Sequence, residues 1–185
     1  MVKEFEQRGD AILRRLPPSA CAVEVGVFLG TLSEYLLQRR SDLRLSLVDS
    51  WLPAEQHPQA YRNTRDEHAH VSAEKVAIQR ATALDKVKPF GARALVIEMA
   101  SFDAAATVDD CSLDLVFLDA DHSYEGVRAD IRAWLPKVKP GGWIGGHDYQ
   151  NPTALYDFSG VKRAVDEAFP EGVELDENFT WFRRC

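Results

Sequence analysis

The sequence contains little of what several classes of protein require. Its three cysteines, Cys21, Cys111 and Cys185, are scattered without the spacing of metal ligands, which predicts ordinary reduced thiols. No apolar run approaches the roughly 18 residues of a membrane span, and no signal-peptide pattern is present. Neither repeats nor low-complexity tracts occur. We therefore expect a cytoplasmic protein with no membrane partner.

Positive charge is also scarce. The chain has 22 Lys and Arg residues against 29 Asp and Glu residues, with a formal net charge of -7 and a pI near 5.2. Because nucleic-acid affinity rests on clustered Lys and Arg side chains, we expect a small-molecule substrate and no nucleic-acid partner. At 185 residues, the sequence is long enough for one well-buried domain, 1–185, and too short for two ordinary ones.

A third absence is the dinucleotide fingerprint G-x-G-x-x-G. The apolar run that starts at Cys21 passes instead through Glu24, Gly26 and Gly30 before a helical pattern begins at Thr31. Glycines at the end of a first strand let the backbone approach a ligand, and the next helix offers free N–H groups there. Since the Glu24 carboxylate would repel a phosphate, the loop favours a cationic ligand without phosphate. Taken alone, the pattern also fits a simple tight turn.

Helical and strand patterns alternate along the chain. The N-terminal segment 1–18 carries an amphipathic helical pattern at 3–16, expected to pack over the sheet edge or the mouth of the ligand site. One predicted strand opens at Cys21 and runs into the loop with Glu24 and Gly26. Further strands are predicted at 43–48, 94–98, 113–118 and 142–146, and helices at 31–40, around 127–135 and at 160–169. Two final runs, 172–175 and 179–183, predict an antiparallel hairpin. The fold class is α/β: a single domain with a Rossmann-like, doubly wound, mostly parallel sheet and a C-terminal antiparallel hairpin.

Residues 51–88 are longer than an ordinary crossover connection. Helical spacing begins at Tyr61 and stops before Pro89, while the segment 51–70 is rich in His, Arg, Pro and Tyr. This segment leaves the ligand-binding edge of the sheet, so it is a candidate substrate lid, followed by a crossover helix. A plain solvated helix remains an equal alternative.

Polar side chains follow the predicted strands at their carboxyl ends, where ligands of open α/β sheets bind. Asp49 ends the second strand, where nucleotide-binding folds place an acid on a ribose hydroxyl. The fourth and fifth strands should be neighbours, and they supply a cluster of ionisable groups: Asp119, Asp121, His122, His147 and Asp148.

Two longer motifs carry a family resemblance. Phe-Leu-Asp-Ala-Asp-His-Ser-Tyr-Glu-Gly-Val at 117–127 and Leu-Pro-Lys-Val-Lys-Pro-Gly-Gly-Trp-Ile-Gly-Gly-His-Asp-Tyr at 135–149, with the E-x-G-x-x-x-G loop, closely resemble the class I S-adenosylmethionine (SAM) dependent methyltransferases of the Methyltransf_24 type. The resemblance runs from about residue 15 to the C-terminus. It implies an enzyme that uses SAM, a sulfonium without phosphate, to methylate oxygen on a small hydroxylated metabolite. The cofactor-binding residues that we expect are Glu24, Gly26, Gly30, Asp49, Ser50, Met99, Ser101, Phe102 and Asp119.

The resemblance also extends to catechol and macrocin-like sugar O-methyltransferases, which bind magnesium with one acid after strand four and two residues after strand five. The matching metal ligands here are Asp119, His147 and Asp148. Such an ion would draw two substrate oxygens together and lower the pKa of the attacked hydroxyl. His147 departs from the acid usual at its position, so the set favours manganese, iron or zinc over Mg²⁺.

The catalytic base is expected at Asp121, which aligns with the proposed base of the sugar enzymes, or at His122, where catechol enzymes carry a lysine. A metal-independent enzyme is equally compatible with the sequence, with Asp121, His122 or His147 as the base. In that case Asp119 and His122 would shape the methionine pocket, and His147 and Asp148 would bind substrate directly.

A further departure is Ala100, where relatives commonly place an Asp, so adenine recognition would rest on backbone groups at 99–102 and the Ser101 hydroxyl. Two other classes remain open from the residues alone. An NAD-binding oxidoreductase is disfavoured by the missing fingerprint and the antiparallel ending, and a non-catalytic cofactor-binding domain by the dense ionisable cluster. Small relatives with short lids often pair, so we expect a homodimer.

Overall fold

A computed structural model describes residues 3–152 and 157–185 of the chain. Helices and strands alternate, as the sequence predicts. The strands are β1 (Cys21–Val25), β2 (Arg44–Val48), β3 (Ala94–Ile97), β4 (Leu113–Leu118), β5 (Val138–Gly146), β6 (Glu174–Asp176) and β7 (Thr180–Arg184). The helices are α1 (Glu4–Leu13), α2 (Thr31–Arg39), α3 (Gln59–Arg62), α4 (Ala73–Val87), α5 (Ser101–Ala106), α6 (Tyr124–Trp134) and α7 (Ser159–Ala168), with 3-10 turns η1 (Ala54–Gln56), η2 (Glu67–His70), η3 (Lys88–Arg93) and η4 (Leu135–Lys137).

The strands form one sheet in the order β3-β2-β1-β4-β5-β7-β6. The first five are parallel to their neighbours, whereas β7 pairs antiparallel with both β5 and β6. The predicted fold class, including the C-terminal antiparallel hairpin, is therefore confirmed. The strand order reverses between β1 and β4, which places a ligand crevice beyond the carboxyl ends of these two strands.

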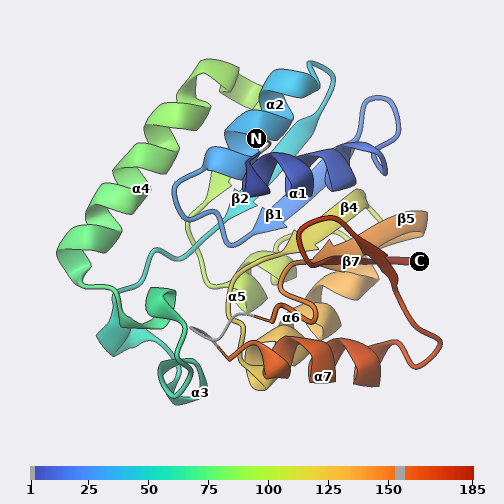
Figure 1. The fold of residues 1–185 in the computed structure, drawn as a ribbon. Helices are drawn as coiled ribbons and strands as arrows, with labels where there is room; N and C mark the ends of the chain where they lie inside the picture. The colour runs from blue at the N-terminus through green and yellow to red at the C-terminus, as the bar shows by residue number, and fades with distance from the viewer. Residues whose placement is uncertain (1–2, 153–156) are drawn as a thin grey trace.

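Two layers of helices cover the sheet (Figure 1). Helices α1, α2 and α4 lie on one face, and α5, α6 and α7 lie on the other. A hydrophobic core lies on each face of the sheet. Alternate residues of each strand pack into one core or the other, because successive side chains of a strand point to opposite faces. In β1, Ala22 packs with the α1, α2 and α4 side, while Val23 and Val25 pack with the other. Sheet and helices thus form two cores that hold the strand ends in fixed register.

Local boundaries differ from expectation in two places. The segment 61–88 is not one long helical run, because the chain forms α3, then η2 and only then α4, with Pro53 and Pro58 standing directly before η1 and α3. Strand β5 begins at Val138 rather than at 142 and includes Pro140. Its N-terminal part pairs irregularly with β4, where the register shifts after Leu113. No helix among the described residues is long and apolar enough to cross a bilayer.

Candidate active site

A cavity of about 820 Å³ opens at the carboxyl ends of the parallel strands. It brings together nearly all of the residues that the sequence nominates. The predicted site residues that line it are Glu24, Gly26, Asp49, Ser50, Met99, Ser101, Asp119, Asp121, His122, His147 and Asp148. Side chains from α1 and from the 51–72 segment, between β2 and α4, complete the wall.

Two predicted cofactor residues do not line this cavity. Gly30 caps α2 with a φ of 68°, and a Cβ there would lie 3.0 Å from the Cα of Ala83, so the glycine lets α4 pack closely against α2. Phe102 lies on α5 with 69% of its surface exposed. Close packing against α4 is thus one physical reason for a glycine at position 30, and its contact with the cofactor stays a prediction.

The glycine loop is shaped by Gly26 and Asp49. Gly26 has a φ of 91°, and a Cβ at this position would lie 2.0 Å from the carbonyl oxygen of Asp119, so only glycine fits. Asp49 Oδ2 accepts hydrogen bonds of 2.9 Å from the backbone N–H groups of Val27 and Phe28, and Oδ1 accepts one of 2.8 Å from Trp51. The acid that we expect to contact the ribose also holds the loop in place.

Glu24 is 2% exposed and accepts a hydrogen bond from the Ser33 hydroxyl. Burial is the main reason that the pKa of Glu24 rises from 4.5 to about 8. An ionised Glu24, as expected from the sequence, is therefore disfavoured at neutral pH, because desolvation outweighs the hydrogen bond from Ser33.

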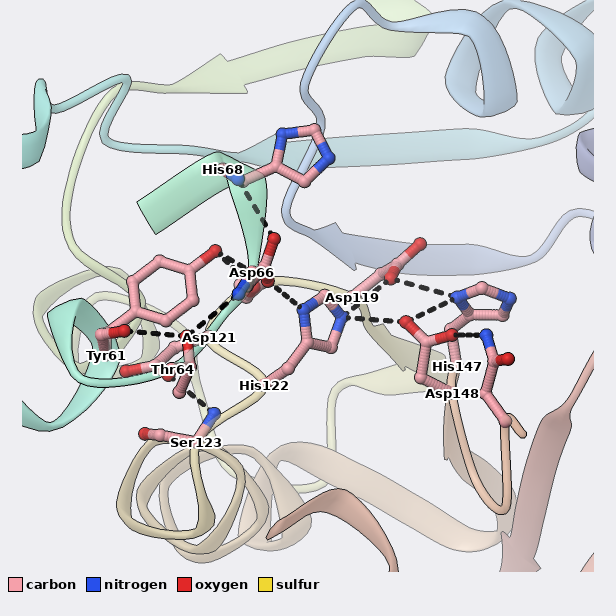
Figure 2. Close-up of polar contacts among 12 residues, drawn as sticks. Tyr61, Thr64, Asp66, His68, Asp119, Asp121, His122, Ser123, His147 and Asp148 are labelled. Carbon is pink, nitrogen blue, oxygen red and sulfur yellow. Dashed lines mark hydrogen bonds and ion pairs between the residues drawn. The ribbon is translucent and has the colours of Figure 1, made fainter. Parts of the chain in front are cut away.

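Carboxylates and imidazoles converge where β4 and β5 end (Figure 2). His122 Nε2 lies 3.3 Å from Asp119 Oδ1 and 3.2 Å from Asp148 Oδ2. His147 Nδ1 lies 3.0 Å from the same Asp148 oxygen and 3.5 Å from Asp119 Oδ1. Adjacent parallel strands place these groups side by side, as the sequence predicts.

Neighbouring charges in this cluster shift the pKa values of its acids and imidazoles. Burial alone would lower the pKa of His122, but hydrogen bonds to Asp119 and Asp66 raise it well above the usual value. Burial would raise the pKa of Asp119, but the positive charges of His147 and Arg8 lower it well below the usual range. The buried acids are therefore balanced by cationic side chains from the protein itself.

Asp121 stands apart from this cluster. Its Oδ1 accepts a 2.8 Å hydrogen bond from the backbone N–H of Ser123, before α6, and the residue lines the cavity. Burial raises the pKa of Asp121 above its usual value, which the contacts with Ser123 only partly offset. Asp121 is thus a more basic carboxylate than an ordinary surface acid.

Arg8 is a site residue that the sequence analysis missed. Its Nη1 donates to Asp119 Oδ2 at 2.8 Å and lies 3.2 Å from His147 Nδ1. Helix α1 thus contributes to the ligand site, consistent with its expected position over the mouth. The amphipathic spacing of this helix located it correctly, but a charged residue on such a helix looks like an ordinary solvated side chain.

Ser101 does not present a free hydroxyl to the cavity. Its Oγ donates to Asp130 Oδ1 at 2.5 Å and accepts from Trp134 Nε1 at 2.9 Å. Asp130 also lines the cavity, is 7% exposed, and has its pKa raised to about 7 by burial. Asp130 is a second residue that motif reading missed, because it lies within α6 rather than at a strand end.

The cluster also contains a set of donor atoms suited to a metal ion. Asp119, His122 and Asp148 each offer one atom, and the three atoms lie within 4.8 Å of one another. Two carboxylates with an imidazole suit manganese, iron or zinc. The sequence nominated His147 rather than His122 for this set, and the structure places His147 directly beside it.

Comparisons with known proteins identify a family from the sequence and a shared fold from solved structures. Residues 23–149 match the family model described as a methyltransferase domain. The O-methyltransferase NovP is 20% identical, covering 98% of this chain and 77% of its own, with a TM-score of 0.60. A Klebsiella pneumoniae protein described as a candidate O-methyltransferase is 16% identical, covering 98% and 80%, with a TM-score of 0.63.

A candidate methyltransferase from Streptococcus mutans was solved in complex with S-adenosylhomocysteine (SAH). It is 12% identical and covers 100% of this chain and 98% of its own, with a TM-score of 0.63. At such identities these structures show a shared fold. No protein of curated function matches the sequence.

Proposed function

We propose that this chain, a SAM-dependent methyltransferase, methylates a hydroxyl group of a small molecule. It belongs to the methyltransferase family whose model matches residues 23–149. The oxidoreductase and non-catalytic alternatives are set aside by this membership. The observation that carries the choice of oxygen is the cluster of acids and imidazoles beside the glycine loop, within one cavity. A homodimer without nucleic-acid partners remains part of the proposal.

Transfer to oxygen is an in-line displacement at the methyl carbon of the sulfonium. The carbon–sulfur bond breaks as the carbon–oxygen bond forms, and the acceptor hydroxyl gives up its proton. The protein must hold the oxygen about 3 Å from the methyl group and provide a proton acceptor. Clustered carboxylates and imidazoles can orient the hydroxyl and receive the proton, which is why the cavity favours this chemistry.

In the proposed complex, the methionine half of the cofactor lies along Glu24 and Gly26, and the ribose reaches Asp49 and Ser50. Met99 and Ser101 border the adenine. Because the Ser101 hydroxyl is engaged by Asp130, we propose that Asp130 takes part in adenine recognition through its second carboxylate oxygen. No protein group among the described residues hydrogen-bonds that oxygen.

Asp121 and His122 are the proposed proton acceptors. The raised carboxyl pKa of Asp121 favours it as a base, whereas both ring nitrogens of His122 face carboxylates. Because the pKa of His122 is raised well above its usual value, Nε2 must first release a proton and lose its contacts with Asp119 and Asp148 before the ring can accept the hydroxyl proton.

A divalent ion is a second part of the proposal. Asp119, His122 and Asp148, with His147 beside them, would hold it, and the bound ion would supply a Lewis acid for the acceptor oxygens. Arg8 already places a positive charge against Asp119. The protein's own cations therefore offer charge compensation at the same carboxylate.

The first test is a calorimetric titration with SAH, using NAD as the control ligand. We expect micromolar binding of SAH and none of NAD. Incubation with SAM and separate catechol, simple phenol, sugar and amine acceptors, followed by mass spectrometry, then tests the acceptor atom. Products methylated only on nitrogen, or SAH binding without methylation of any hydroxyl, would refute the proposed O-methylation.

A further inference from the structure

Asp66 connects the 51–72 segment to the catalytic cluster. It lies between α3 and η2, is 2% exposed, and places Oδ2 2.6 Å from His122 Nδ1. Figure 2 shows the His122 ring between Asp66 on one side and Asp119 and Asp148 on the other. The two nitrogens of this ring therefore have different partners, from different parts of the chain.

The contacts of Asp66 fix the direction in which it can act. Oδ2 also accepts a 3.0 Å hydrogen bond from the Tyr61 hydroxyl, and Oδ1 accepts one of 2.9 Å from the backbone N–H of His68. An ionised carboxylate can only accept hydrogen bonds. Nδ1 of His122 must therefore carry the proton in this contact, and a neutral ring leaves Nε2 as the nitrogen with a free lone pair.

We propose that Asp66 is a positioning residue, which fixes the ring orientation and tautomer of His122 so that Nε2 faces Asp119 and Asp148. The inference rests on the proposed function of His122 at the acceptor site. A base needs this arrangement, because its lone pair must point to the acceptor hydroxyl. A metal-ligating histidine needs the same arrangement, with a carboxylate on its other nitrogen.

The proposal gives the 51–72 segment a defined role. A loop that only covered the cavity could be exchanged without effect on the orientation of His122. Here the segment contributes a buried carboxylate, and its other contacts with Tyr61 and His68 lock that carboxylate in place. The candidate lid of the sequence analysis thus becomes a structural part of the acceptor site.

The first measurement needs no variant and no acceptor. Nitrogen-15 spectra of the histidine side chains, recorded at a pH where the His122 ring is neutral and assigned with His122→Gln, report which ring nitrogen carries the proton. We expect the Nδ1-protonated tautomer. A neutral ring protonated on Nε2 would overturn the proposal, whatever the protein methylates.

The second measurement uses Asp66→Asn, which keeps the shape of the side chain. Both oxygens of Asp66 accept hydrogen bonds, from the Tyr61 hydroxyl, the His68 N–H and His122 Nδ1. In either orientation, the NH₂ group of the asparagine would therefore face at least one of these donors. We expect the His122 tautomer to shift toward Nε2–H and kcat, with catechol as the test acceptor, to fall by about 10²-fold. KM for SAM and the affinity for SAH should stay within about twofold, because Asp66 belongs to the acceptor end in this scheme.

Thr64→Val is the matched control. Thr64 shapes the same loop through hydrogen bonds with Tyr61 and the backbone of Asp66 but does not touch His122, so kcat should change by less than about twofold. Equal losses in Thr64→Val and Asp66→Asn, or an Asp66→Asn variant with wild-type kcat and tautomer, would contradict a specific role for Asp66. If wild type does not methylate catechol, the failure concerns the acceptor, and the tautomers of wild type and Asp66→Asn still decide the inference.

Discussion

Arg8 Nη1 lies 2.8 Å from Asp119 Oδ2, so the first helix of the chain touches the carboxylate that follows the fourth strand. The side chains of Arg8 and Asp119 are 21% and 15% exposed. An acid this far from water needs a positive partner. The contact therefore ties the placement of α1 to the charge state of the active site.

The Arg8 contact predicts a loss of stability on substitution. Arg8→Gln should lower the free energy of unfolding by about 2 kcal/mol, because a largely buried carboxylate loses a charged donor. Arg14→Gln, which removes an exposed ion pair between the residue directly after α1 and Asp176, should cost less than about 1 kcal/mol. Urea unfolding of wild type, Arg8→Gln and Arg14→Gln measures both losses. Equal losses would show that the Arg8–Asp119 contact contributes no more to stability than an exposed ion pair.

Metal binding can be tested apart from turnover. We expect calorimetry to show tighter binding of Mn²⁺ than of Mg²⁺, and His122→Gln to weaken Mn²⁺ binding by at least about tenfold, because an imidazole ligand is lost. Arg8→Gln should strengthen it, since the competing positive charge leaves Asp119. A wild-type protein that binds neither ion, holds no metal by elemental analysis and keeps its activity after chelation would refute the metal site.

The raised pKa of Glu24 predicts a stability that depends on pH. Because the folded protein binds this proton more tightly than the unfolded chain, the stabilising contribution is complete below pH 4.5 and is lost as the pH rises to about 8. Between pH 4.5 and about 8, the free energy of unfolding of wild type should therefore fall by about 3–5 kcal/mol relative to that of Glu24→Gln. Exposed Glu55→Gln should show no such trend in urea unfolding.

Turnover should depend on the proposed proton acceptors. Asp121→Ala and His122→Ala should each lower kcat by about 10²-fold or more while SAH affinity stays within about threefold. Asp103→Ala, an exposed acid on α5, is the control and should behave as wild type. The assignment is wrong if both cavity variants keep the wild-type rate in a SAM-dependent methylation assay.

Gly26 and Gly172 form a matched pair for the glycine loop, with φ values of 91° and 93°. Alanine is strained at both positions, at a cost of about 1–3 kcal/mol. A Cβ at position 26 also meets the backbone of Asp119, whereas a Cβ at position 172 has no atom of the described residues within 4 Å apart from its chain neighbours. Gly26→Ala should therefore lower the free energy of unfolding by at least about 1 kcal/mol more than Gly172→Ala does, as measured by thermal or urea unfolding. It should also weaken SAH binding, whereas Gly172→Ala should not.

Much of the fold could be predicted from the sequence, because its signals are local. Apolar strands followed by helical spacing gave the parallel sheet, and the final hairpin gave the antiparallel ending. The cluster of Asp119, His122, His147 and Asp148 was predictable for the same reason, since neighbouring parallel strands bring their ends together.

The remaining site residues depend on contacts between distant parts of the chain. Asp66 is separated from His122 by 56 residues and Arg8 from Asp119 by 111, and neither lies at a strand end. A charged side chain on a polar loop or an amphipathic helix gives no sign that it will be buried. Gly30 illustrates a related difficulty, because its spacing matches a motif while close packing against Ala83 also requires a glycine there.

The Asp49 carboxylate has a consequence for how the cofactor associates. Its hydrogen bonds with the backbone N–H groups of Val27, Phe28 and Trp51 are contacts within the protein itself and need no ligand atom. Ordering the loop is thus part of folding, and binding does not have to restrict those backbone dihedrals again. The loop behaves as a preorganised receptor, so the free energy of its contacts with the cofactor contributes to affinity with little conformational penalty.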